Sequence, residues 1–175
     1  MKNLRLLQIF VFAIFMMSCN KDDDNDNNEP LSGEPGITAN INGGSYSNYT
    51  FTDGIYQITL GTNGPTMSID AADIFGDQIT IFLNGTGGFE SGVVKNMGNI
   101  DSNNFTTYVN IRQQSSPQIS YFSTSGNVTI SENRAHPTEA GKRLISGTFN
   151  VSAASISDNN TTVMIGTFTE LEYVD

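Results

Sequence analysis

The sequence predicts an all-β domain, most simply an antiparallel β-sandwich of about 8–10 strands. From residue 36 onward, apolar and polar side chains alternate with a period of two, and Gly, Asn, Asp and Pro separate the alternating runs. No stretch keeps a helical period, so the crossover helices that a parallel sheet needs are missing. The alternative is one sheet curled into a lipocalin-like β-barrel, because short strands joined by frequent turns suit both designs.

The first strands are predicted from alternation and turn chemistry. The run over 37–41 is apolar at every second position, and Asn42-Gly43-Gly44 turns it into an aromatic-rich segment over 45–52. Asp53-Gly54 is a strong signal for a two-residue hairpin, because both residues tolerate the positive φ that a type I′ turn requires. We therefore expect the next strand, over 56–60, to be separate from its predecessor.

The remaining strands follow from the same alternation. They cover residues 67–71, 79–83, 105–111, 119–123, 128–130, 143–152 and 162–173, with a short piece over 92–94. The last two runs each contain Gly-Thr-Phe, at 147–149 and 166–168. A glycine inside a strand often marks a bulge or the close approach of another backbone, and we expect one of these at both positions.

The chain begins with the features of a lipoprotein signal peptide. Lys2 and Arg5 precede an apolar run from Leu6 to Met17, which is too short to span a bilayer as a helix. The small residue Ser18 then precedes Cys19, the sole cysteine. This junction resembles the lipobox of bacterial lipoproteins, which implies cleavage before Cys19 and acylation of its thiol, with palmitate among the acyl chains. An ordinary secretory signal with a chance cysteine is the alternative.

The predicted domain organisation follows from this junction. We expect a signal peptide over 1–18, a disordered acidic tether over 19–35, and a single β domain over 36–175. The tether opens with four residues, Lys21, Asp22, Asp23 and Asp24, that resemble the export signal of surface lipoproteins in Bacteroidota. That resemblance implies an outer-membrane protein exposed on the cell surface, with a domain facing the periplasm as the alternative.

Charge restricts the partners. The chain has 8 basic and 18 acidic residues and a formal net charge of −10, and loss of the two basic residues of the leader makes it more negative. This balance argues against nucleic acid and anionic lipid as electrostatic partners.

Three segments of the domain carry a family resemblance. Residues 37–46, 121–130 and 145–151 are similar to a family of uncharacterised Bacteroidota lipoproteins with a small all-β domain. The resemblance implies a β domain on a lipid anchor. It supplies no functional residues, because the family has no assigned activity.

Residues suited to catalysis or metal binding are sparse. His136 is the sole histidine and lies in the polar loop 132–142, where we expect an exposed side chain without a catalytic role. Asp70, Asp73 and Asp77 crowd one turn and are weak candidates for a metal site, although a solvated β-turn explains them more simply. We therefore expect no metal and no cofactor.

Aromatic residues offer a weak indication of ligand binding. Trp is absent, so Tyr46, Tyr49, Phe51 and Tyr56 are the candidate contacts for a ligand such as a glycan. The alternative is that they alternate into the core of their strands. The sequence thus favours a noncatalytic envelope lipoprotein that binds a glycan or an envelope protein or serves as a structural module. A carboxylate-based glycoside hydrolase, or another hydrolase that needs no histidine, is the alternative.

Overall fold

The computed structural model describes residues 34–62, 65–157 and 160–175. These residues contain nine antiparallel strands. The strands are β1 (Gly36–Gly43), β2 (Tyr46–Leu60), β3 (Met67–Asp73), β4 (Gln78–Leu83), β5 (Val94–Asn96), β6 (Tyr108–Arg112), β7 (Ser120–Ala135), β8 (Lys142–Ser155) and β9 (Thr161–Val174). Within these ranges no residue lies in a helix, and no helix capable of crossing a membrane is found. The predicted signal peptide, Cys19 and residues 21–24 lie outside the described residues.

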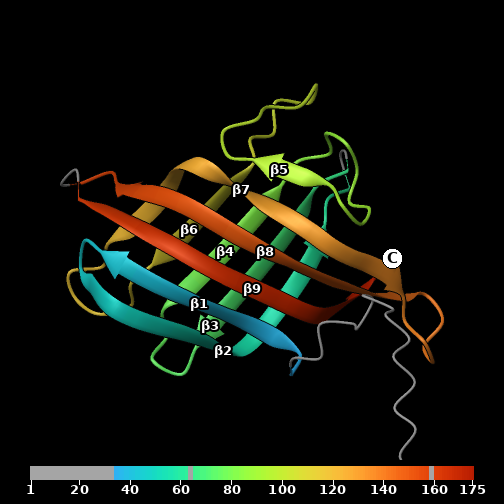
Figure 1. Cartoon of the computed structure of the whole chain (residues 1–175), viewed down its shortest axis with the longest axis horizontal. Coiled ribbons are helices and arrows are strands. Elements are labelled where there is room, and N and C mark those ends of the chain that lie inside the picture. The colour runs from blue at the N-terminus through green and yellow to red at the C-terminus, as the bar shows by residue number, and fades with distance from the viewer. Residues whose placement is uncertain (1–33, 63–64, 158–159) are drawn as a thin grey trace, which may run out of the picture. The chain divides into compact units, whose positions relative to one another are not determined.

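Eight of the strands close into an up-and-down barrel. Each pairs with the next one along the chain, in the order β1-β2-β3-β4-β6-β7-β8-β9, and β9 pairs back onto β1. The ninth strand, β5, pairs with β7 beyond the point where β6 ends. In Figure 1, β1, β9 and β8 cross in front of β3, β4 and β6, as opposite walls of a barrel do. The preferred sandwich prediction is therefore wrong and the barrel alternative is confirmed, because closure leaves no edge between two separate sheets.

Long, bent strands replace several of the predicted short ones. β2 continues through Asp53-Gly54, pairing with β1 before this point and with β3 after it, and the pairing register shifts between Asp53 and Ile55. The predicted hairpin is wrong because Asp53 caps the start of β1 instead. Its carboxylate accepts a hydrogen bond of 2.6 Å from the backbone N of Ile37. In the same way, the runs predicted over 119–123 and 128–130 belong to one strand, β7, whose register shifts where the two runs meet.

Side chains pointing inward fill the barrel. They come from alternate positions of every barrel strand and form one apolar cluster. Its fully buried members include Ile37, Ile41, Phe51, Met67, Ile69, Ile79, Ile81, Leu83, Val109, Ile111, Tyr121, Val128, Ile130 and Met164. An eight-stranded barrel is just wide enough for side chains to fill its interior, so this one is built around a packed core.

The repeated Gly-Thr-Phe sequence forms a reciprocal contact between β8 and β9. Gly147 lies opposite Phe168, and Phe149 lies opposite Gly166. Each phenyl ring occupies the space where the opposite glycine would carry a Cβ atom, and a backbone oxygen of the strand on the other side also approaches each glycine. The predicted close approach of another backbone is thus confirmed at both glycines.

Candidate functional site

The four aromatic residues named as weak ligand contacts, Tyr46, Tyr49, Phe51 and Tyr56, pack with the core. Phe51 has no exposed surface and Tyr46 is 7% exposed, while Tyr49 and Tyr56 are partly buried against the same cluster. The hydroxyl of Tyr56 accepts a hydrogen bond of 3.1 Å from the backbone N of Glu172. These side chains therefore contribute to packing and to hydrogen bonds within the barrel.

Asp73 and Asp77, two of the weak metal candidates, organise the turn between β3 and β4. The carboxylate of Asp73 accepts hydrogen bonds from the backbone N of Phe75 at 2.8 Å and of Asp77 at 3.0 Å, and another from the hydroxyl of Tyr49. Asp77 accepts a hydrogen bond of 3.0 Å from the hydroxyl of Tyr46. Burial, together with Asp77, raises the pKa of Tyr46 far above its usual value, which keeps this hydroxyl a donor. Both carboxylates therefore have a structural role, because they accept hydrogen bonds within and around this turn.

The third candidate, Asp70, points away from the other two. It is exposed on the outer wall of β3, where its carboxylate accepts hydrogen bonds from the hydroxyls of Ser68 at 2.8 Å and Thr80 at 2.7 Å. The structure thus does not bring Asp70, Asp73 and Asp77 together as one set of metal ligands.

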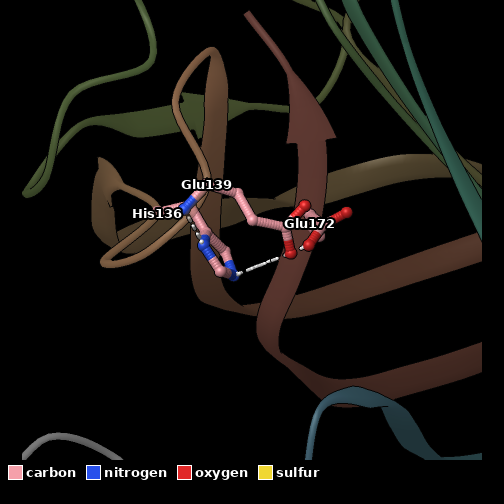
Figure 2. A group of neighbouring side chains, drawn as sticks. All are labelled: His136, Glu139 and Glu172. Carbon is pink, nitrogen blue, oxygen red and sulfur yellow. Dashed lines mark hydrogen bonds and ion pairs between the residues drawn. The ribbon is translucent and has the colours of Figure 1, made fainter.

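The structure does bring His136 together with two glutamates that the sequence did not connect. Figure 2 shows His136 and Glu139, from the loop between β7 and β8, pointing toward Glu172 of β9. Nε2 of His136 lies 3.6 Å from Oε2 of Glu172 and 4.0 Å from Oε1 of Glu139. One imidazole nitrogen and two carboxylates are ligand types that zinc accepts, so this cluster must be tested as a metal site.

The hydrogen bonds of the histidine do not fit a metal ligand. Nδ1 of His136 accepts hydrogen bonds from the backbone N of Glu139 at 3.0 Å and of Thr138 at 3.3 Å. A metal-bound imidazole needs the opposite arrangement, in which its second nitrogen donates to a carboxylate or carbonyl. Since Nδ1 accepts these hydrogen bonds, the ring proton belongs on Nε2, the nitrogen that faces the carboxylates.

A lysine already bridges the two carboxylates. Nζ of Lys142 lies 2.6 Å from Oε2 of Glu139 and 2.6 Å from Oε1 of Glu172. These hydrogen bonds raise the pKa of Lys142, and the one to Glu139 lowers the pKa of that glutamate. A divalent cation between the carboxylates would meet the ammonium charge. We conclude that the cluster fastens the β7–β8 loop to β9, and that His136, with its side chain 16% exposed, is more buried than predicted because it packs into this cluster.

An uncharged face covers part of the outer wall of the barrel, across β2, β1, β9, β8 and β7. One row across these strands consists of Thr52, Thr38, Thr167, Thr148 and Thr129. The next row consists of Thr50, Asn40, Ile165, Asn150 and Asn127. We call these ten residues the Thr–Asn face. All except the partly buried Thr129 are exposed, and β1, β9 and β8 are on the side toward the viewer in Figure 1.

A hollow of about 470 Å³ lies over the Thr–Asn face. Eight of the ten residues line it, and its other lining residues, Ala39, Phe149 and Gly166, are the inward-facing residues between them. No residue of this lining is charged. The face was missed at the level of sequence, although its residues occupy the polar positions of the alternating pattern, because neighbours in a row come from distant parts of the chain.

Two other hollows have charged linings. One, of about 390 Å³, lies on the outer wall of β2, β3 and β4 and includes Asp70. Another, of about 430 Å³, is lined in part by Glu90, Arg143 and Asp175. The Nε atom of Arg143 donates a hydrogen bond of 2.9 Å to Oδ1 of Asn133. The arginine side chain in this hollow is therefore held in place by a contact within the domain.

An aromatic row also lies on the outer wall, over β4, β6 and β7. The rings of Phe82 and Tyr108 stack with centroids 5.4 Å apart and planes 15° apart, and the ring of Phe122 lies 6.0 Å from that of Tyr108. All three are partly buried. Since the stacked rings cover each other's faces, we interpret the row as cross-strand pairs that stabilise the sheet.

Comparison with known protein families, with curated proteins and with solved structures gave no match. The fold and surface therefore define the class by themselves. The described domain is an all-β, eight-stranded, up-and-down barrel with a packed interior and with hollows on its outer surface.

Proposed function

We propose that the protein is an envelope lipoprotein, held at the outer membrane through acylated Cys19, and that its barrel is a noncatalytic binding module on the cell surface. The packed interior is the observation that supports a binding role for the outer wall. With Phe51, Ile69 and Ile81 among the side chains that fill the barrel, a ligand meets the protein from outside. The partner is a glycan or an envelope protein, which an acidic surface favours over nucleic acid.

The hydrolase alternative has less support, because a positively charged side chain bridges each of two pairs of carboxylates that the fold brings together. Lys142 bridges Glu139 and Glu172. Arg134 bridges Glu132 at 2.7 Å and Glu170 at 2.5 Å. A glycosidase needs one protonated carboxyl group and one free carboxylate across the scissile bond, whereas the carboxylates of these two pairs are held in ion pairs with Lys142 and Arg134.

The anchor is tested by metabolic labelling with a palmitate analogue. We expect label on the wild-type protein and none on the Cys19→Ala variant, with the variant lost from the membrane fraction, since two or three acyl chains are needed for stable attachment. A labelled Cys19→Ala protein, or an unlabelled wild type, would contradict the proposal.

Surface display is tested by protease treatment of intact cells. The wild-type barrel should be removed without lysis. A variant with Asn in place of Lys21, Asp22, Asp23 and Asp24 should stay acylated and become protected, because the export signal is lost while the anchor remains. Full protection of the wild-type protein would show that the domain faces the periplasm.

A further inference from the structure

We propose that the Thr–Asn face binds a neutral polysaccharide, which lies in the hollow across β1, β9 and β8. This inference rests on the proposed function of the barrel as a binding module and names the ligand class and the site.

The first argument is the regular spacing of polar groups. Neighbouring strands lie about 4.8 Å apart, and alternate residues along a strand are separated by roughly 6.8 Å. The two rows of the face therefore present hydroxyl and amide groups on a grid, with Thr38, Thr148 and Thr167 in one row and Asn40 and Asn150 in the next. A polymer with hydroxyl groups at regular intervals can contact several of these groups at once.

The second argument is the match of hydrogen-bonding capacity. A threonine hydroxyl and an asparagine amide can each donate and accept, as sugar hydroxyls do. Little of this capacity is used within the face: the hydroxyls of Thr38 and Thr167 lie 3.1 Å apart, and the hydroxyl of Thr50 donates to Oδ1 of Asn40 at 3.5 Å. The remaining groups are open to a ligand or to water that bridges to one.

The third argument is charge. The chain has a formal net charge of −10, yet the lining of this hollow is uncharged, unlike the linings that contain Asp70 or Arg143. Covering hydroxyl and amide groups with a hydroxyl-rich ligand avoids the cost of desolvating a charge. An anionic polymer would find no cation in the lining and would be repelled by the rest of the protein. The ligand is therefore a neutral polysaccharide.

The fourth argument is an apolar centre within the polar rows. Ile165 is 54% exposed in the middle of the second row, and Val163, two residues earlier on β9, is 42% exposed. Thr38, Thr167 and Thr148 form the neighbouring row, so their methyl groups add apolar carbon to the same face. Sugar rings have C–H surfaces as well as hydroxyls, so a mixed face of this kind suits them better than a wholly polar one.

The test is affinity electrophoresis of the full chain, purified in a non-ionic detergent. Native gels contain one of two soluble neutral polysaccharides, a mixed-linkage β-glucan or a galactomannan, or one of two anionic ones, alginate or polygalacturonate. We expect retardation by at least one neutral polymer and none by the anionic ones.

The matched variants keep shape and remove hydroxyls. The double variant T38V/T167V deletes both partners of one hydrogen bond, so it leaves no unpaired group, and valine keeps the β-branched shape that strands favour. We expect its affinity for the retarding polymer to fall about three- to tenfold. The control T59V removes an exposed hydroxyl from β2 outside the Thr–Asn face and should bind as the wild type does. Thermal unfolding checks that both variants are folded.

Several outcomes would overturn the inference. They are the absence of retardation by either neutral polymer, equal retardation by the anionic ones, an equal loss in T59V, and a dimer of this chain that T38V/T167V abolishes. Failure of the inference is distinguishable from failure of the anchor, because palmitate labelling of Cys19 is scored separately. If Tyr108→Ala abolishes retardation and T38V/T167V does not, the barrel is a binding module whose site is the aromatic row, and the Thr–Asn face is excluded.

Discussion

Replacing Gly166 by alanine should destabilise the barrel substantially. A Cβ atom there would lie 2.7 Å from Cε1 of Phe149 and 2.5 Å from the backbone O of Thr38, whereas unstrained contacts to carbon need roughly 3.5–4.0 Å. The ring can turn aside only by disturbing a packed core, and the oxygen belongs to the neighbouring strand β1. Overpacking of this kind costs typically 1–3 kcal/mol, and the backbone contact places Gly166→Ala near the upper end, at about 2–3 kcal/mol.

The assay is equilibrium unfolding in urea, followed by fluorescence or circular dichroism. With a slope of about 2 kcal/mol per molar urea, the midpoint should fall by roughly 1 M. Gly54→Ala is the matched control, because the nearest atom to its added Cβ, Cγ2 of Ile74, is 3.5 Å away. It should change the stability by less than about 0.5 kcal/mol.

A double mutant isolates the ring contact. Shortening Phe149 to leucine vacates part of the space, so Gly166→Ala should cost at least about 1 kcal/mol less in the Phe149→Leu background than in the wild type. The reasoning is refuted if Gly166→Ala unfolds within about 0.5 kcal/mol of the wild type, or if Gly54→Ala costs as much.

Three further predictions concern polar groups. Zinc at micromolar concentration should not raise the melting temperature of the wild type, whereas a Lys142→Met variant, with its two carboxylates unbridged, should gain stabilisation by zinc or calcium. Tyrosine ionisation should leave the free energy of unfolding unchanged up to about pH 10 and lower it above that pH, because the pKa values of Tyr46 and Tyr49 are raised from 10.0 in the folded state. Urea titrations at several alkaline pH values should show a smaller fall in this free energy for Tyr46→Phe than for the wild type. Asn84 is fully buried and its Nδ2 donates to two backbone oxygens, so Asn84→Leu should lower the free energy of unfolding by about 1–3 kcal/mol in the same titrations.

Much of the strand content could be predicted, because alternation reports directly on which side chains face inward. Spacing alone places Ile37, Ile69 and Ile81 on the apolar faces of their strands, and each is fully buried. Closure could not be predicted in this way. Whether β9 pairs with β1 depends on contacts between residues more than a hundred positions apart, and a period of two is the same in a sandwich and a barrel.

The hairpin predicted at Asp53-Gly54 is wrong for a physical reason. Asp-Gly has the conformational freedom for a hairpin, but the same carboxylate can accept a hydrogen bond from elsewhere, and in this barrel Asp53 accepts one from Ile37. Local preference then yields to a long-range contact. His136 shows the same limit, since Glu172 lies far away in sequence and reaches the loop only through the pairing of β8 with β9.

The Gly-Thr-Phe repeats connect the core to the uncharged face. Because side chains alternate along a strand, the register that places Phe149 over Gly166 and Phe168 over Gly147 also places Thr148 beside Thr167 on the outside. A slip of one residue between β8 and β9 would expose the phenyl rings and bury the threonines. The contact between glycine and phenylalanine thus fixes the positions of the hydroxyl groups that we propose bind the ligand.

This connection separates two kinds of substitution. Changes at Gly147 or Phe168, which do not line the hollow, should alter polysaccharide binding only as far as they unfold the barrel or shift the register. T38V/T167V should alter binding with little change in the free energy of unfolding, because the double substitution leaves the glycines and the phenyl rings of the contact between β8 and β9 unchanged. A loss of binding that followed stability across both kinds of variant would mean that the Thr–Asn face has no direct part in recognition.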